Sequence, residues 1–109
     1  MGYEHRNAVI RDTFLGIEDH GIFTFNLTLD YGGSCQGAGS YTLHSTGYTA
    51  PGGLCLLRRI LTTVGVDSWE KLKGAHVVAL VEGGLVRGLA PFLLDGPPVM
   101  FSEVLEGAQ

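Results

Sequence analysis

The sequence has few charged residues for a chain of its length. Only 17% of its 109 residues are Asp, Glu, Lys or Arg, whereas 45% are hydrophobic. About a quarter of the residues are charged in an average soluble domain. The shortage favours burial of part of the surface between subunits, and a monomer with an adhesive surface is the alternative.

Cysteines, metal-ligand spacings and long hydrophobic runs are scarce as well. Cys35 and Cys55 stand without a CxxC motif, and the four histidines are scattered. This pattern argues against a disulfide framework and a zinc site, and we expect no cofactor. No apolar run approaches the roughly 20 residues that a membrane helix needs. Since the polar residues after Met1 also predict no signal peptide, we expect a cytoplasmic protein without a membrane partner.

Basic residues form no cluster longer than Arg58-Arg59, and the net charge is −4. Proteins that bind DNA or long RNA need a basic stripe to neutralise phosphates, so we expect neither as a partner. A small anionic ligand is compatible with this charge, because one or two arginines and a few backbone N–H groups suffice to hold it.

The order of the predicted elements indicates an α+β fold in a single domain, residues 1–109. We expect a mainly antiparallel sheet of about five strands, with two helices inserted between strands 3 and 4, because strands and helices are grouped rather than alternating. The predicted strands are residues 8–17, 22–29, 40–44, 75–82 and 85–93, and the predicted helices are residues 54–64 and 69–72.

Two segments show clear periodicity. Apolar residues alternate with polar ones in the second strand, at Phe23, Phe25, Leu27 and Leu29, which is typical of a half-buried strand. The first helix has apolar residues at helical spacing, at Leu54, Leu57, Leu61 and Val64 with Ile60 beside them. Gly65 is placed to end this helix.

The last two predicted strands form a hairpin. Gly83-Gly84 is a good two-residue turn between them. The first of the two strands is apolar on both faces, which predicts a place at the centre of the sheet or at an interface. Pro91 should bring the end of the second strand to an edge or a bulge.

A glycine-rich segment separates the second and third predicted strands. Between Asp30 and Leu43 it has glycines at positions 32, 33, 37 and 39. A strand follows it and no GK[ST] is present, so it is neither a P-loop nor a Rossmann fingerprint. Two interpretations remain open: bare backbone whose N–H groups converge on an anion, or a wide bulged connection between strands.

Arg87 is the most unusual charge, because it lies in the apolar segment LVRGLAPF. A charge in such a place needs a partner or water. The guanidinium can hold a phosphate in a bidentate manner, with Gly88 allowing close approach, or the strand can simply have a solvated outer face. Arg58-Arg59, on the polar face of the helix, is more simply a solubility feature.

Catalytic residues are few. Cys35, in the glycine segment, can serve as a nucleophile only if a distant histidine acts as its base. A cysteine hydrolase of this kind predicts that Cys35→Ala abolishes turnover of some substrate.

Three segments resemble one family of small bacteriophage proteins. They are LGIEDHGIFTFNLTLDYGGSCQGAGSYTL, GLCLLRRILTTVGVDSWEKLKGAHV and LVRGLAPFL, which together cover most of residues 15–93. The pattern is similar to that of the Thoeris anti-defence sponges, which capture cyclic ADP-ribose isomers made by bacterial TIR-domain enzymes; some members also capture cyclic oligonucleotides. The resemblance implies binding without catalysis, by a homodimer or higher assembly with pockets near the subunit interface.

The resemblance also implies ligand-binding residues. Arg87 and Gly88 match the strand arginine and the small residue that contact phosphate, and Gln36 and Gly37 match the glycine loop. Leu57 stands where the family often has an aromatic that can stack on a base, and Asp67 stands in the loop bordering the pocket.

The chain departs from the family pattern at three places. The segment Gly37-Ala38-Gly39-Ser40-Tyr41 replaces the common GFGGY, and Leu57 replaces an aromatic. The segment Pro97-Pro98-Val99-Met100-Phe101 replaces a tryptophan-containing end. Loss of a stacking ring costs roughly 1–3 kcal/mol per base, so the departures bear on which nucleotide is bound. The alternative function is a phage protein-interaction module that docks on a host protein and has no nucleotide site.

Overall fold

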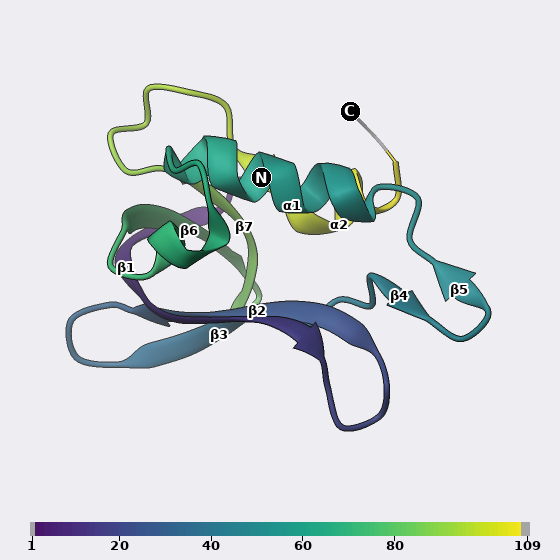
Figure 1. Ribbon diagram of the computed structural model, residues 1–109. Helices are drawn as coiled ribbons and strands as arrows, with labels where there is room; N and C mark the ends of the chain where they lie inside the picture. The colour runs from purple at the N-terminus through teal and green to yellow at the C-terminus, as the bar shows by residue number, and fades with distance from the viewer. Residues whose placement is uncertain (1, 108–109) are drawn as a thin grey trace.

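Eight strands form one antiparallel sheet in the computed structural model, which describes residues 2–107 (Figure 1). The strands are β1 (Glu4–Ile17), β2 (Phe23–Asp30), β3 (Cys35–Gly39), β4 (His44–Ser45), β5 (Tyr48–Thr49), β6 (His76–Glu82), β7 (Leu85–Pro91) and β8 (Val99–Met100). Their order across the sheet is β5-β4-β2-β1-β6-β7-β8, and β3 pairs with β2 outside this path.

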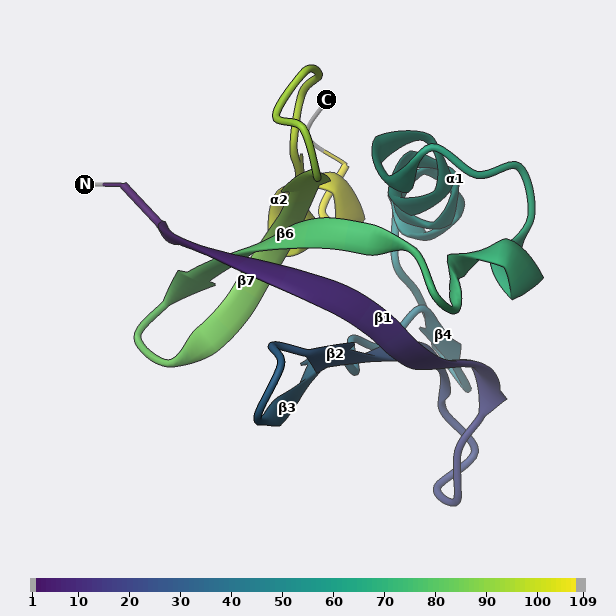
Figure 2. The same cartoon turned by 90° about the vertical axis from the view of Figure 1, so that its left-hand side faces the viewer.

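The long strand β1 joins the two halves of the sheet. Its first half pairs with β6 and its second half with β2. Figure 2 shows β1 crossing the molecule between these two neighbours. Three helical segments complete the fold: α1 (Gly53–Val64), the 3₁₀ helix η1 (Trp69–Leu72) and α2 (Phe101–Leu105). Helices α1 and α2 lie on the same side of the curled sheet (Figure 1).

The main core lies between this sheet and the helices. Phe25, Leu27 and Leu29 are fully buried, as the alternation in β2 predicts. Phe101 of α2 packs edge-to-face on Phe25, with ring centroids 5.7 Å apart. Burial of such side chains contributes on the order of 1.5–3 kcal/mol each.

The buried face of α1 differs from the predicted one. Leu56 and Ile60 are fully buried, whereas Leu54 is 85% exposed. The remaining predicted residues of this face, Leu57, Leu61 and Val64, are only partly buried against the core. Because apolar residues cover a wide arc of this helix, periodicity shows that the arc exists but does not show where its centre lies.

The predicted α+β class with a mainly antiparallel sheet and the helix over residues 54–64 are confirmed, whereas the predicted number of strands and the placement of the second helix are wrong. Residues 2–107 form eight strands instead of about five, and residues 69–72 form a 3₁₀ helix. The second α-helix lies near the C-terminus, at Phe101–Leu105. The missed strand β3 consists largely of glycine and has no side-chain alternation, while β4, β5 and β8 have only two residues each. Such elements form through tertiary pairing and leave no periodic signal.

Other turn and strand predictions are confirmed. Gly83 and Gly84 have φ values of 62° and 79°, and such positive angles at both positions are typical of a type I′ hairpin turn. Gly65 ends α1 in the left-handed conformation and donates its N–H to the carbonyl of Leu61. Strand β6 is central, between β1 and β7, and is buried on both faces. No helix within residues 2–107 is long and apolar enough to cross a membrane.

Gly88 is required by the close packing of β7 on β8. A Cβ atom at this position would lie 2.3 Å from the carbonyl oxygen of Val99 and 2.8 Å from the sulfur of Met100. We therefore expect Gly88→Ala to lower the free energy of unfolding by about 1–3 kcal/mol in urea titrations. The matched control is Gly33→Ala, since nothing lies within 4 Å of a Cβ there. Equal stability of both variants and the wild type would contradict this role of Gly88.

Candidate functional site

A hollow of about 270 Å³ lies where β3 and β7 approach each other. We call it the Arg87 hollow. Its lining residues are Gly37, Ala38, Gly39, Ser40, Tyr41, Leu85, Val86 and Arg87. Among residues 2–107, β3 pairs only with β2, and β8 pairs with β7 only at Gly88 and Leu89. The facing edges of β3 and β7 therefore offer backbone N–H and C=O groups that no strand pairing uses.

Arg87 lies at an irregularity in β7. Leu80 of β6 is opposite Gly88, but the next residue, Val81, is opposite Val86, so Arg87 is the extra residue of a β-bulge. Bulges change the direction of a side chain and are frequent beside functional sites. The Arg87 side chain is 43% exposed, which identifies a solvated charge rather than a buried one.

The guanidinium of Arg87 forms a weak ion pair within the chain. Its Nε atom lies 4.0 Å from Oε1 of Glu82, whose side chain is 57% exposed. Exposed pairs at such a distance contribute little to stability. The planar fork of donors is therefore available to an anion such as a phosphate.

Gln36 fixes the distance between β3 and the hairpin of β6 and β7. Its Nε2 donates to the carbonyl of Gly84 over 2.7 Å, and its Oε1 accepts from the hydroxyl of Tyr31 over 2.7 Å. The guanidinium of Arg6 covers the ring of Tyr31, with Cζ 3.9 Å from the ring centroid. Both polar ends of Gln36 are thus used inside the chain, which makes it a positioning residue for the Arg87 hollow.

The other predicted site residues do not line this hollow. Gly88 faces β8. Leu57 lines a separate hollow of about 240 Å³ between α1 and the segment of β4 and β5. Asp67 is exposed and pairs with Nζ of Lys71 over 2.7 Å. One chain therefore brings together Gln36, Gly37 and Arg87, but leaves Leu57 and Asp67 elsewhere.

Ser40, Leu85 and Val86 also line the hollow, although no motif in the sequence marks them as site residues. Their position follows from the approach of β3 to β7. Ser40 is one of two non-glycine residues within 2–107 that have a positive φ, at 68°. A Ser after Gly39 in a segment rich in turn residues is the only sequence signal of this corner.

Cys35 is exposed and lies at the start of β3. Its sulfur accepts a hydrogen bond from Nη1 of Arg11 over 3.0 Å, and this contact is the main cause that raises the pKa of Arg11. Within residues 2–107 no histidine forms a hydrogen bond with Cys35, and no group of three His, Cys, Asp or Glu residues is placed to hold a metal ion.

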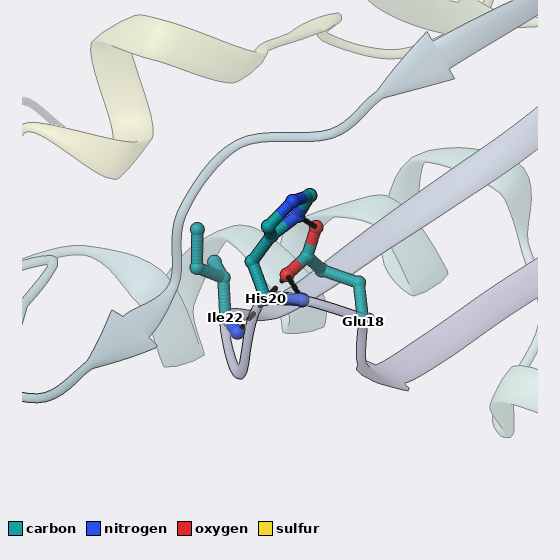
Figure 3. Close-up of polar contacts among 3 residues, drawn as sticks. All are labelled: Glu18, His20 and Ile22. Carbon is teal, nitrogen blue, oxygen red and sulfur yellow. Dashed lines mark hydrogen bonds and ion pairs between the residues drawn. The ribbon is translucent and has the colours of Figure 1, made fainter.

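Glu18 organises the hairpin between β1 and β2 (Figure 3). Its carboxylate accepts the backbone N–H groups of His20 and Ile22, and it contacts Nδ1 of His20 over 3.1 Å. These hydrogen bonds, that of the His20 ring first, lower the pKa of Glu18. The carboxylate is therefore a fixed negative charge near neutral pH.

Comparison of the chain with protein-family models, with curated proteins and with solved structures finds no match.

The lowered pKa of Glu18 gives a pH-dependent contribution to stability. A depressed carboxyl pKa stabilises the fold above the ordinary value of 4.5, and this contribution is lost as the pH falls through the lowered pKa. We expect Glu18→Gln to be less stable than the wild type near neutral pH, and the difference to shrink under acid conditions. Urea unfolding across a pH series measures it. The control is Asp19→Asn, an exposed neighbour; a constant difference between wild type and Glu18→Gln at every pH would contradict the assignment.

Proposed function

We propose that this chain binds a small cyclic nucleotide, of the cyclic ADP-ribose class or a cyclic oligonucleotide, and sequesters it without cleaving it. It would thus act as a phage anti-defence protein of the kind that the sequence resembles. The observation that carries the proposal is the Arg87 hollow. There, an exposed guanidinium stands opposite a strand with little side-chain cover and an unpaired edge.

The chemistry of this hollow suits a phosphate. The guanidinium supplies paired donors, and the unpaired edge of β3 in the same hollow presents backbone N–H groups that alternate with carbonyls. Gly37 lines the hollow with backbone alone. Gln36 holds the two strands at their spacing before a ligand binds. Binding therefore loses less conformational entropy than it would with mobile strands.

The hollow is small for the whole of a cyclic nucleotide. Its volume, about 270 Å³, is close to the lower end of the roughly 300–1,000 Å³ of typical ligand pockets. Leu57 and Asp67, which the resemblance assigns to the same site, lie elsewhere in the chain. Both facts support a site that two subunits complete, in a homodimer or a higher assembly.

Exposed hydrophobic residues support self-association. Leu54 is 85% exposed, Leu93 77% and Ile17 71%. With the low content of charged residues, these side chains offer apolar contacts to a second subunit. The same exposed side chains also suit the alternative, a protein-interaction module that docks on a host protein without a nucleotide site.

Absorbance of the purified protein separates these two functions. A retained purine nucleotide raises the absorbance at 260 nm relative to 280 nm, and heat denaturation should release it. The interaction module predicts a spectrum that Trp69 and the tyrosines account for entirely.

Arg87→Ala tests the nucleotide site directly. Loss of a charge-assisted hydrogen-bonding group should weaken binding by about 1.5–3 kcal/mol, or roughly ten- to a hundredfold in Kd. The fold should remain intact, because the Arg87 side chain is exposed and its contact with Glu82 is long. Calorimetry with a cyclic ADP-ribose isomer measures the change. The matched control is Arg58→Ala, an exposed arginine on α1 that should bind like the wild type. Unchanged affinity in Arg87→Ala would remove Arg87 from the site.

A further inference from the structure

A second hollow, of about 240 Å³, lies on the face of β1 and β2 that is turned away from the core. We call it the Asn26 hollow. Its lining residues are Phe14, Glu18, Ile22, Thr24, Asn26, Ser40 and Thr42. Phe14 is directly opposite Asn26 in the pairing of β1 with β2. The residues thus come from both strands of this hairpin, from its turn and from the segment after β3.

The aromatic wall of this hollow depends on a glycine. A Cβ atom at Gly16 would lie 3.2 Å from Cζ of Phe14, so the ring lies across the bare backbone of its own strand. This contact is related to the aromatic rescue of strand glycines. Phe14 nevertheless remains 45% exposed, and it offers an apolar surface beside polar groups.

The polar groups of the hollow have unused hydrogen-bonding capacity. Within residues 2–107 no partner is found for the carboxamide of Asn26 or for the hydroxyls of Ser40 and Thr42. The Glu18 carboxylate is fixed by the hairpin turn, and its Oε2 meets only the His20 ring, which leaves that oxygen able to accept a further bond. No lysine, arginine or histidine lines the hollow, so it does not suit a phosphate.

The combination selects one class of ligand chemistry. A carboxylate, a carboxamide and hydroxyls beside an aromatic ring fit a neutral ring that carries hydroxyl groups. Carboxylates accept hydrogen bonds from the hydroxyls of ribose in nucleotide-binding folds. The apolar face of such a ring can rest on Phe14.

Ser40 connects the two hollows, since it lines both. Its φ of 68° is unfavourable for a non-glycine residue, and strained backbone of this kind is frequent where ligands bind. Its backbone N–H is held by the carbonyl of Phe25 over 2.7 Å, which fixes the corner at the end of β3. A ligand that extends past Ser40 can therefore place different groups in the two hollows.

We propose that the Asn26 hollow binds a sugar ring with adjacent hydroxyls, namely a ribose of the nucleotide whose phosphate lies in the Arg87 hollow. The assignment of this sugar to the nucleotide in the Arg87 hollow rests on the proposed function. The recognition of a hydroxylated ring rests on the Asn26 hollow alone.

The test is an NMR titration of the isotope-labelled protein with adenosine, with 2′,3′-dideoxyadenosine and with inorganic pyrophosphate. Adenosine should shift the side-chain amide signal of Asn26, and the dideoxy compound should bind about fivefold more weakly, the loss expected for one or two neutral hydrogen bonds. The Asn26→Leu variant should bind adenosine more weakly than the wild type by a similar factor. Its affinity for pyrophosphate should be unchanged. Thr28→Ala, a half-buried residue of β2 outside the hollow, should behave like the wild type.

The sugar site is overturned if adenosine does not shift the Asn26 signal. It is also overturned if both nucleosides bind to Asn26→Leu with the same affinity as to the wild type. If adenosine binds as expected but pyrophosphate does not bind, the proposed phosphate site fails and the sugar site stands. ADP-ribose distinguishes the source of the sugar: affinity unchanged by Asn26→Leu would overturn the assignment of sugar and phosphate to one ligand.

Discussion

The approach of β3 to β7 is the constraint on which the candidate site depends. β3 pairs with β2 alone, and no strand pairing joins it to β7. Instead, Gln36 bridges the gap by its hydrogen bond to the carbonyl of Gly84. Because the two edges are close but not paired, they leave a hollow lined by backbone groups. The bulge in β7 then places the Arg87 guanidinium beside it.

The glycines of this region serve several purposes. Gly37 leaves one face of β3 bare beside Asn26, since a Cβ there would lie 3.6 Å from its Oδ1. At Gly39 a Cβ would lie 2.7 Å from the ring of Phe25, so this glycine lets the chain turn tightly over the core. The absence of a side chain at Gly88 likewise lets β8 pack closely on β7. Close packing of the backbone thus explains part of the glycine content, and bare surface at the candidate site explains another part.

The sequence predicted the elements that have strong local signals. The alternation in β2, the Gly83-Gly84 turn and the end of α1 at Gly65 are all found in the structure. It did not predict β3, β8 or α2, because their pairing and packing come from distant residues. For the site, the sequence indicated Arg87 and Gly37, but their shared hollow depends on a bulge and on a bridge between residues 48 positions apart. Neither has a periodic signal, and the contact of Gly88 with β8 has none either.

Nucleotide sequestration can be measured by calorimetric titration with a panel of cyclic ADP-ribose isomers and cyclic di- and trinucleotides. Each ligand that binds would then be recovered by heat denaturation and analysed. We expect tight binding of at least one member of the panel and its recovery intact. No binding across the panel would contradict nucleotide sequestration and favour the protein-interaction module, while recovery of an altered ligand would identify an enzyme.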